Sequence, residues 1–257
     1  MRKRSVFLLS FLFIALIVPL PFLHNKPIHI SIDDFHYALK DLCDSNYYSI
    51  FQQPVFHFLQ DIHNYTGAKF TLYTYAEAMD HKVSCIPQKN IIELSKNSNW
   101  LRIGLHSANP ESKNENDSLF KLAFSFIQGS LHGGGGKAKT LRLHYFHATP
   151  VEIDFLKENE ISTLLSADDD RISYSLSPEL NDSLIKNDFL LYNGMQFKRT
   201  DFRIEKTFFP ILDIWKHLND DEIIFFTHEW ALDSWNFIKF KSTIFYLSFY
   251  GSNFIID

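Results

Sequence analysis

Downstream of residue 25, short runs of β-branched and aromatic residues alternate with longer segments whose apolar residues recur at helical spacing. The strand-like runs are IHISI (28–32), KFTLYTY (69–75), LRIGLH (101–106), TLRLHYFH (140–147), ISTLL (161–165) and EIIFFTH (222–228). The helix-like segments are 53–67, 87–98, 116–129, 149–160 and 206–219. This alternation predicts an α/β fold with a parallel sheet and crossover helices, open or closed into a barrel. Since no linker interrupts residues 25–257, we expect a single domain.

The first 24 residues have a different pattern. Arg2, Lys3 and Arg4 precede an uncharged run over 6–23. As a helix this run would measure about 27 Å, just short of the hydrocarbon core of a bilayer. Basic residues on the N-terminal side alone predict a cytoplasmic N-terminus, with the remainder of the chain outside and a membrane as partner. No small-residue cleavage site follows, so a signal anchor and a signal peptide both remain open for residues 1–24.

Composition narrows the class of protein. Of the 257 residues 46% are hydrophobic, including 26 Phe and 11 Tyr, which is sufficient for one large core. The net charge of -5, with no Lys/Arg cluster beyond residue 4, argues against a nucleic-acid partner. Cys43 and Cys85 are the only cysteines; in an exported chain they could pair, and two free buried thiols are equally compatible with the sequence.

Polar residues gather where the predicted strands end. The residues are Asp33 and Asp34, His106, Arg142 with His144 and His147, Asp168 to Asp170, and His228 with Glu229. Taken singly, each has an ordinary explanation, such as a helix cap, a structural histidine, or a solvated turn paired to Arg171. The carboxyl ends of parallel strands converge on one opening, however. Aspartate and histidine together are ligands for a divalent metal, most simply zinc.

Four of these segments, HISIDDF, IGLHSANP, LRLHY and FFTH, occur in an order and spacing that resemble the polysaccharide deacetylase family, also called the NodB-homology fold. The resemblance covers nearly everything after the N-terminal segment, through degenerate motifs. It implies an irregular (β/α) barrel, a carbohydrate substrate and metal-dependent removal of N- or O-acetyl groups from glycans.

The resemblance also implies roles for individual residues. Asp33 would be the general base, oriented by Arg142, and His228 would be the general acid. Asp34 and His106 would bind the metal. Tyr145 matches a family motif and is expected, with Asp169 and Glu229, to contact substrate.

The chain departs from the family motifs at several positions. Pro110 occupies the position of a second metal-binding histidine, Phe35 that of a glycine and His144 that of a proline. A zinc site needs a replacement ligand. His147 is the first candidate and His144 the second; on an extended segment they would face opposite ways, so only one would enter the site.

Three functions remain open on this basis. The first is a membrane-anchored or secreted deacetylase acting on cell-surface carbohydrate outside the cytoplasm. The departures at Phe35 and Pro110 motivate a second, a non-catalytic protein of the same fold that binds glycan or assists an assembly. The third is another metal-dependent amidase or phosphoesterase using the same ligands.

Overall fold

A computed structural model describes residues 20–78, 81–111, 116–131 and 138–256. The strands are β1 (Pro27–Asp33), β2 (Phe70–Tyr75), β3 (Glu77–Ala78), β4 (His81–Lys82), β5 (Leu101–Ser107), β6 (Thr140–Leu141), β7 (Thr163–Leu165), β8 (Phe189–Tyr192), β9 (Met195–Lys198), β10 (Phe202–Arg203), β11 (Ile223–His228) and β12 (Asn253–Ile255). The α-helices are α2 (Leu20–Leu23), α3 (Tyr37–Asp44), α4 (Pro54–Thr66), α5 (Gln88–Lys96), α6 (Asp117–Ser130), α7 (Pro150–Glu158), α8 (Pro178–Asn187), α9 (Pro210–Lys216) and α10 (Ser234–Phe249). Short 3₁₀ turns are η1 (Ile50–Gln52), η2 (Val83–Cys85), η3 (His144–Phe146) and η4 (Glu229–Ala231).

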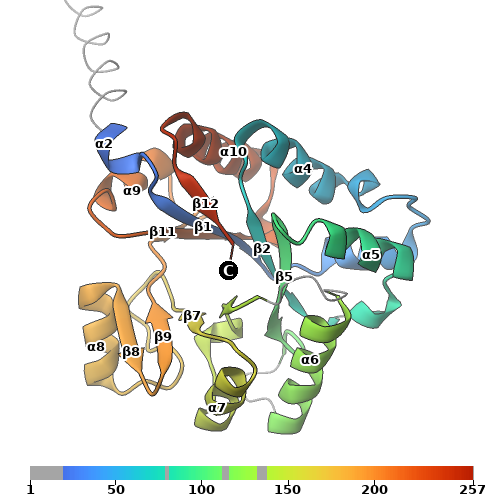
Figure 1. The fold of residues 1–257 in the computed structure, drawn as a ribbon, viewed down its shortest axis with the longest axis horizontal. Helices are drawn as coiled ribbons and strands as arrows, with labels where there is room; N and C mark the ends of the chain where they lie inside the picture. Colours follow the sequence, from blue (N-terminus) through green and yellow to red (C-terminus); the bar gives the residue numbers. More distant parts are fainter. Residues whose placement is uncertain (1–19, 79–80, 112–115, 132–137, 257) are drawn as a thin grey trace, which may run out of the picture.

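The main sheet is parallel, as the alternation of elements predicts. Its strand order is β10-β11-β1-β2-β5, and β12 also pairs with β1. The central strand β1 is almost completely buried, which explains its near-continuous apolar run. Helices surround the sheet, with α4 and α10 adjacent on one side (Figure 1), where the ring centroids of Phe58 and Phe237 lie 4.4 Å apart.

A second sheet has the strand order β6-β7-β9-β8. The two sheets are adjacent: the Tyr73 hydroxyl of β2 donates a hydrogen bond to the Thr140 carbonyl of β6 at 3.0 Å. Within the described residues no backbone ladder joins the two sheets, so closure into a barrel by hydrogen bonds is not confirmed. The α/β class with a parallel sheet is confirmed.

Several elements differ from the sequence prediction. The run 140–147 is a strand only at Thr140–Leu141, because Tyr145 and Phe146 both have φ of 54° and turn the chain into η3. The hairpin β8–β9 was not predicted, although its Asn193–Gly194 turn, with φ of 48° and 74°, is typical of a two-residue hairpin. The helices α8 and α10 and the strands β10 and β12 were also not predicted.

The helix α6 carries apolar residues both on its buried face and on its exposed face. Phe120, Ala123, Phe124 and Ile127 are buried, whereas Leu119 and Leu122 are exposed. The helix therefore presents a wider apolar surface than its core contact needs.

Most of the predicted anchor lies outside the described residues. Of residues 1–24 the structure describes only 20–24, where α2 ends and Leu23 is buried. Within the described residues, no helix combines the length and the apolar character needed to cross a bilayer.

The structure joins Cys43 and Cys85 in a disulfide that closes a 42-residue separation between α3 and η2. The cross-link restrains the segment that follows the Asp33–Asp34 pair. We expect the double variant Cys43→Ala/Cys85→Ala to lose about 4 kcal/mol of unfolding free energy, because a loop of this length restricts the unfolded chain strongly. Guanidinium unfolding of both proteins without reductant measures the difference. A loss below about 1 kcal/mol would contradict this prediction.

Candidate active site

Two adjacent carboxylates at the end of β1 reach one region of the molecule because the backbone turns between them. Asp33 ends the strand in extended conformation, and Asp34 follows with φ of 53°, a left-handed value uncommon for a residue with a side chain. The Asp33 side chain is 2% exposed and that of Asp34 is 15% exposed. The turn frees Asp34 from the alternation that would place it on the opposite face of the sheet.

Asp33 lies in a buried polar pocket formed mainly by Arg142. The Arg142 guanidinium, which is fully buried, contacts the Asp33 carboxylate at 3.1 Å. It also donates to the hydroxyls of Ser31 at 2.6 Å and Thr200 at 2.9 Å. This network fixes the position of Asp33 and compensates its charge, which is the contact predicted for Arg142.

Asp34, His106 and His144 form a compact group of potential metal ligands. Asp34 Oδ1 lies 3.3 Å from His106 Nε2 and 3.7 Å from His144 Nδ1, and the two ring nitrogens are 3.2 Å apart. One donor atom from each residue lies within 4.8 Å of the others. The side chains come from the ends of β1 and β5 and from η3 after β6, so strand ends do converge as predicted.

Each of the two histidines makes a hydrogen bond through the ring nitrogen that faces away from Asp34, and this leaves the other nitrogen available to a cation. His106 Nδ1 donates to the Arg142 carbonyl at 2.6 Å, and His144 Nε2 donates to the Pro110 carbonyl at 3.2 Å. When a metal is bound and both rings are neutral, those protons leave the lone pairs of His106 Nε2 and His144 Nδ1 directed toward Asp34; without a metal, a proton on His106 can take its place. Three electron-rich atoms this close repel one another unless a proton or a metal lies between them. The set of one carboxylate and two imidazoles suits zinc with a position open for water.

The ionisation of these ligands also suits a metal site. Burial disfavours the charged form of Asp34, but hydrogen bonding and charge from His106 outweigh it and hold the pKa of Asp34 well below its usual range. Burial, with the adjacent His106, lowers the pKa of His144 to about 4. Asp34 is therefore ionised and His144 neutral near pH 7, the forms that bind metals.

Two aromatic residues hold the Asp34 carboxylate from outside the ligand group. The Tyr75 hydroxyl, at the end of β2, donates to Oδ1, and Trp230 Nε1 donates to Oδ2 at 2.8 Å. Trp230 also stacks on His228, with ring centroids 4.9 Å apart. Sequence reasoning missed both residues; Tyr75 could have been found as one more polar group at a strand end.

His228 lies beside the carboxylate pair, as predicted. It ends β11 directly opposite Asp33 in the parallel ladder, and its Nδ1 lies 2.5 Å from Oε1 of Glu205. Burial opposes protonation of the ring, but the hydrogen bond to Glu205, together with the charges of Asp33, Glu205 and Asp34, raises the pKa of His228 above its usual value. Glu205 follows the two-residue strand β10 and was not identified from the sequence.

The remaining predicted site residues have different surroundings. His147 is half-buried and is not part of the ligand group, which contains His144, the second candidate, instead. Tyr145 is 48% exposed beside His144, with ring centroids 4.0 Å apart, so its expected contact with substrate stays a prediction. Asp169 pairs with Arg171 at 2.6 Å, as predicted for a solvated turn, and that hydrogen bond lowers the pKa of Asp169 to about 2.

The structure gives Glu229 a different role from the predicted one. Its carboxylate, on a residue 7% exposed, accepts hydrogen bonds from the backbone N–H groups of His36, Tyr37 and Ala38 at 2.7–2.8 Å. Acceptors at a helix start satisfy otherwise unpaired donors. Glu229 therefore caps α3, and this role replaces the substrate contact predicted for it.

Solved structures share this arrangement of elements. The Bc1960 peptidoglycan N-acetylglucosamine deacetylase is 11% identical and superposes with a TM-score of 0.52, covering 90% of this chain and 86% of its own. The fold is that of the polysaccharide deacetylases. A 4-alpha-glucanotransferase from Thermococcus litoralis is 14% identical with a TM-score of 0.57, and this chain spans only 39% of its length. No protein-family model matches the chain, and no curated protein matches it in sequence.

At these identities the likeness establishes the polysaccharide-deacetylase fold alone. Two neighbours with different names on one fold show that chemistry must be argued from the side chains.

Proposed function

We propose that the protein is a metal-dependent hydrolase that removes an acetyl group from a carbohydrate. The observation that carries the proposal is the Asp34–His106–His144 ligand group, flanked by a buried carboxylate, Asp33, and an acid–base histidine, His228. A non-catalytic glycan-binding protein would not need a base and an acid held next to a metal site. The presence of the metal ligands together with a base and an acid therefore favours catalysis over the binding-only alternative.

In the proposed mechanism, Asp34, His106 and His144 hold the metal, which when bound polarises the acyl carbonyl and lowers the pKa of water. Asp33 accepts the proton as water attacks the carbonyl carbon, and Arg142 holds this carboxylate in position through their ion pair. His228 donates its proton to the leaving nitrogen or oxygen. Hydrolysis of an amide or ester needs one group that accepts a proton and one that donates a proton, and Asp33 and His228 supply them.

A carbohydrate substrate is supported by exposed aromatic rings beside the catalytic groups. Trp230 is 59% exposed while bonded to Asp34, and Tyr145 is 48% exposed beside His144. Such rings combine an apolar face with a polar edge, which suits sugar rings. The neighbour of the same fold is named as a deacetylase of N-acetylglucosamine in peptidoglycan, and this supports an N-acetyl sugar as the first substrate to test.

We further propose that the domain works outside the cytoplasm, either secreted or held to the membrane by residues 1–24. The basic cluster before an uncharged run supports this topology. The Cys43–Cys85 disulfide agrees with it, since disulfides persist in oxidising compartments.

Acetate release tests the proposal. The purified protein, stripped with EDTA and reloaded with ZnCl₂, is incubated with chitotetraose, an acetylated xylo-oligosaccharide and bis(p-nitrophenyl) phosphate. We expect zinc-dependent acetate release from a sugar and no phosphodiester cleavage. Zinc binding without acetate release from either sugar would favour the binding-only alternative, and cleavage of the phosphodiester alone would favour a phosphoesterase.

The Glu205→Gln variant tests the role of His228 through pH. Glu205 contributes to the raised pKa of His228, so replacing it with a neutral side chain lowers that pKa. A general acid works only below its pKa, so the alkaline limb of the kcat/KM profile should move to lower pH. The profile of Asp154→Asn, a change on the exposed surface of α7, should coincide with the wild type. An unmoved limb in Glu205→Gln would remove His228 from the role of acid.

A further inference from the structure

A second group of potential metal ligands lies away from the active site. Asp201, His217 and Asp220 each offer one donor atom, and these atoms lie within 4.8 Å of one another. Asp201 precedes β10, and the other two residues belong to the connection between α9 and β11. Ile224, which donates its N–H to Asp201, lies near the start of β11. His228 ends that strand four residues later, about 13 Å away along an extended chain.

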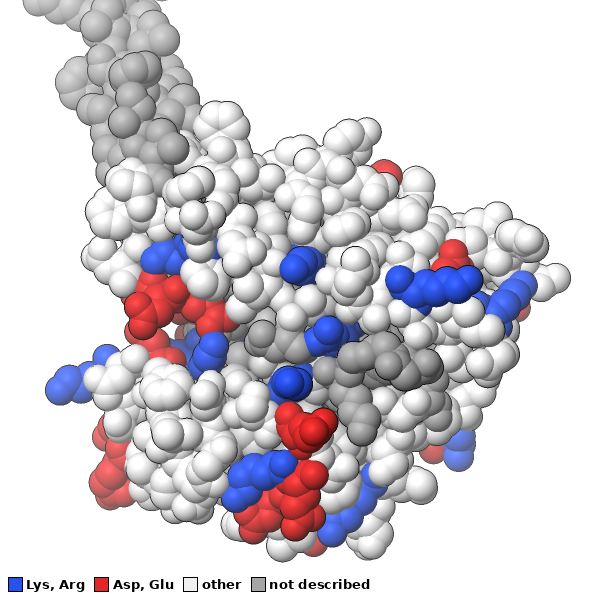
Figure 2. Space-filling model, in the orientation of Figure 1, with Lys and Arg blue, Asp and Glu red and all other residues white. Residues whose placement is uncertain are grey.

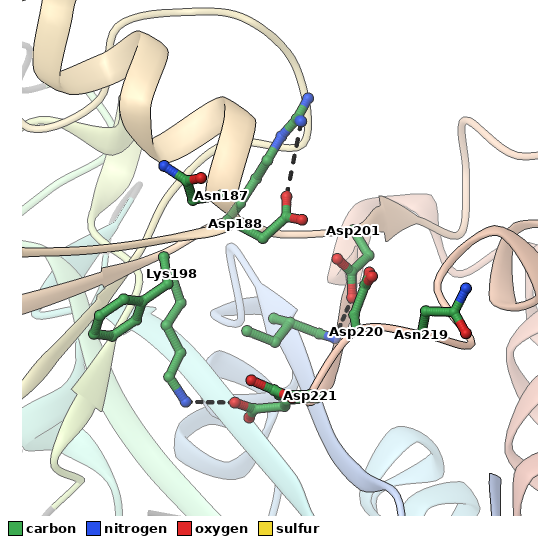
Figure 3. Close-up of a pocket in the computed structure, with 11 residues that line it drawn as sticks. Asn187, Asp188, Lys198, Asp201, Asn219, Asp220 and Asp221 are labelled. Carbon is green, nitrogen blue, oxygen red and sulfur yellow. Dashed lines mark hydrogen bonds and ion pairs between the residues drawn. The ribbon is translucent and has the colours of Figure 1, made fainter. Parts of the chain in front are cut away.

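Asp201 and Asp220 line a cavity between the β8–β9 hairpin and the edge of the main sheet. The cavity has a volume of about 390 Å³. Its charged lining comprises the carboxylates Asp188, Asp201, Asp220, Asp221 and Glu222 and the cations Lys198 and Arg199. Figure 2 shows acidic side chains gathered at the left of the molecule beside a hollow, and Figure 3 shows the Asp201 and Asp220 side chains close together on one side of the cavity. The lining is therefore anionic overall.

The two carboxylate oxygens of Asp201 have different partners. Its side chain is 3% exposed, and Oδ2 accepts the Ile224 N–H at 2.7 Å. Oδ1 accepts no hydrogen bond from the described residues; its contact there is His217 Nδ1, at 3.4 Å. Because Asp201 lines the cavity, Oδ1 is open to a cation there, which would compensate the charge of this carboxylate.

The cations near the cavity do not supply that compensation. Lys198 pairs with Glu222, and Arg199 pairs with Asp170 and Asp188. Lys26 donates to the backbone carbonyls of Leu218 and Asp220 and not to a carboxylate. In the described part of the chain, neither the Asp201 carboxylate nor the Asp220 carboxylate pairs with a Lys or Arg. The two carboxylates share Nδ1 of His217, which lies 2.7 Å from Asp220.

We propose that Asp201, His217 and Asp220 bind a second divalent cation, with Asn219 or water available from the cavity to complete its coordination. Two carboxylates and one imidazole suit Zn²⁺ or Mn²⁺. The cation would join the start of β10 to the loop before β11 and so stabilise the edge of the main sheet.

Metal stoichiometry tests the proposal independently of catalysis. Wild-type protein and variants are dialysed to equilibrium against ZnCl₂ and, separately, MnCl₂, and bound metal per chain is measured. The wild type should bind two ions. His217→Gln should bind one and keep zinc-dependent acetate release, and Asp34→Asn/His106→Ala should also bind one while losing that activity.

The matched control is Asp221→Asn, which removes a cavity charge without removing one of the three ligands, and which should still bind two ions. Asp201→Asn keeps an oxygen for the Ile224 N–H, so it should fold and bind one ion. In the Asp34→Asn/His106→Ala background, the remaining ion should raise the melting temperature, and His217→Gln should abolish that rise. Two ions bound by His217→Gln, or none by Asp34→Asn/His106→Ala, would overturn the second site. Failure of the proposed hydrolysis alone would leave this count unchanged.

Discussion

The Asp33→Asn variant will release acetate about 10²- to 10⁴-fold more slowly than the wild type while still binding metal at Asp34, His106 and His144. Loss of a general base costs catalysis of this size, because water must then attack without a group to accept its proton. Asparagine retains the shape and an oxygen for the Arg142 guanidinium, 3.1 Å away in the wild type, but cannot accept the proton. Steady-state acetate release with zinc measures the effect.

Stability must be measured in parallel, because the substitution leaves the buried Arg142 charge uncompensated. Removing one partner of a buried ion pair costs about 3–5 kcal/mol. Hydrogen bonds from Arg142 to Ser31 and Thr200 remain and should keep the variant folded. Asp154→Asn, at an exposed pair with Lys157 on α7, is the matched control and should change neither rate nor stability. Undiminished hydrolysis in folded Asp33→Asn would exclude Asp33 as the base.

The sequence predicted the strand ends well because their signal is local. A buried run such as 28–32 followed by two carboxylates locates a strand and its carboxyl end together. Parallel pairing then brings the ends together, so Asp34 and His106 meet although they are far apart in the chain. Arg142 reaches Asp33 from the second sheet by a side-chain contact, without a shared backbone ladder.

What the sequence did not reveal depends on backbone turns and tertiary contacts. Glu205 follows the two-residue strand β10, which is too short to leave a hydrophobic period. The helix α10 has apolar residues on all sides, with Phe240 buried and Trp235 exposed, so it lacks the single apolar face that marked the other helices. Glu229 was wrongly predicted to contact substrate because its use in capping α3 is visible only in three dimensions.

The choice between His144 and His147 shows why a ligand cannot be assigned from spacing. An extended segment would have pointed them to opposite faces, and nothing in the sequence says which face is inward. The segment is a turn instead, because Tyr145 and Phe146 adopt left-handed conformations. That turn directs His144 toward Asp34, where its Nε2 bonds to the carbonyl of Pro110, the residue at the position of the missing histidine.

His144→Ala should therefore weaken zinc binding at the active site, and acetate release should fall with it. The loss of affinity should exceed the roughly 10- to 100-fold that follows removal of a residue that only hydrogen-bonds to a metal ligand. His147→Ala is the matched control: it removes an imidazole three residues away that is not part of the ligand group, and zinc affinity should stay within about twofold of the wild type. Both substitutions are made in the His217→Gln background, so that the ion titrated is the one held by Asp34. The reverse result, with His147 essential and His144 dispensable, would show that the segment 144–147 rearranges when metal binds and would restore the extended geometry that the sequence predicted.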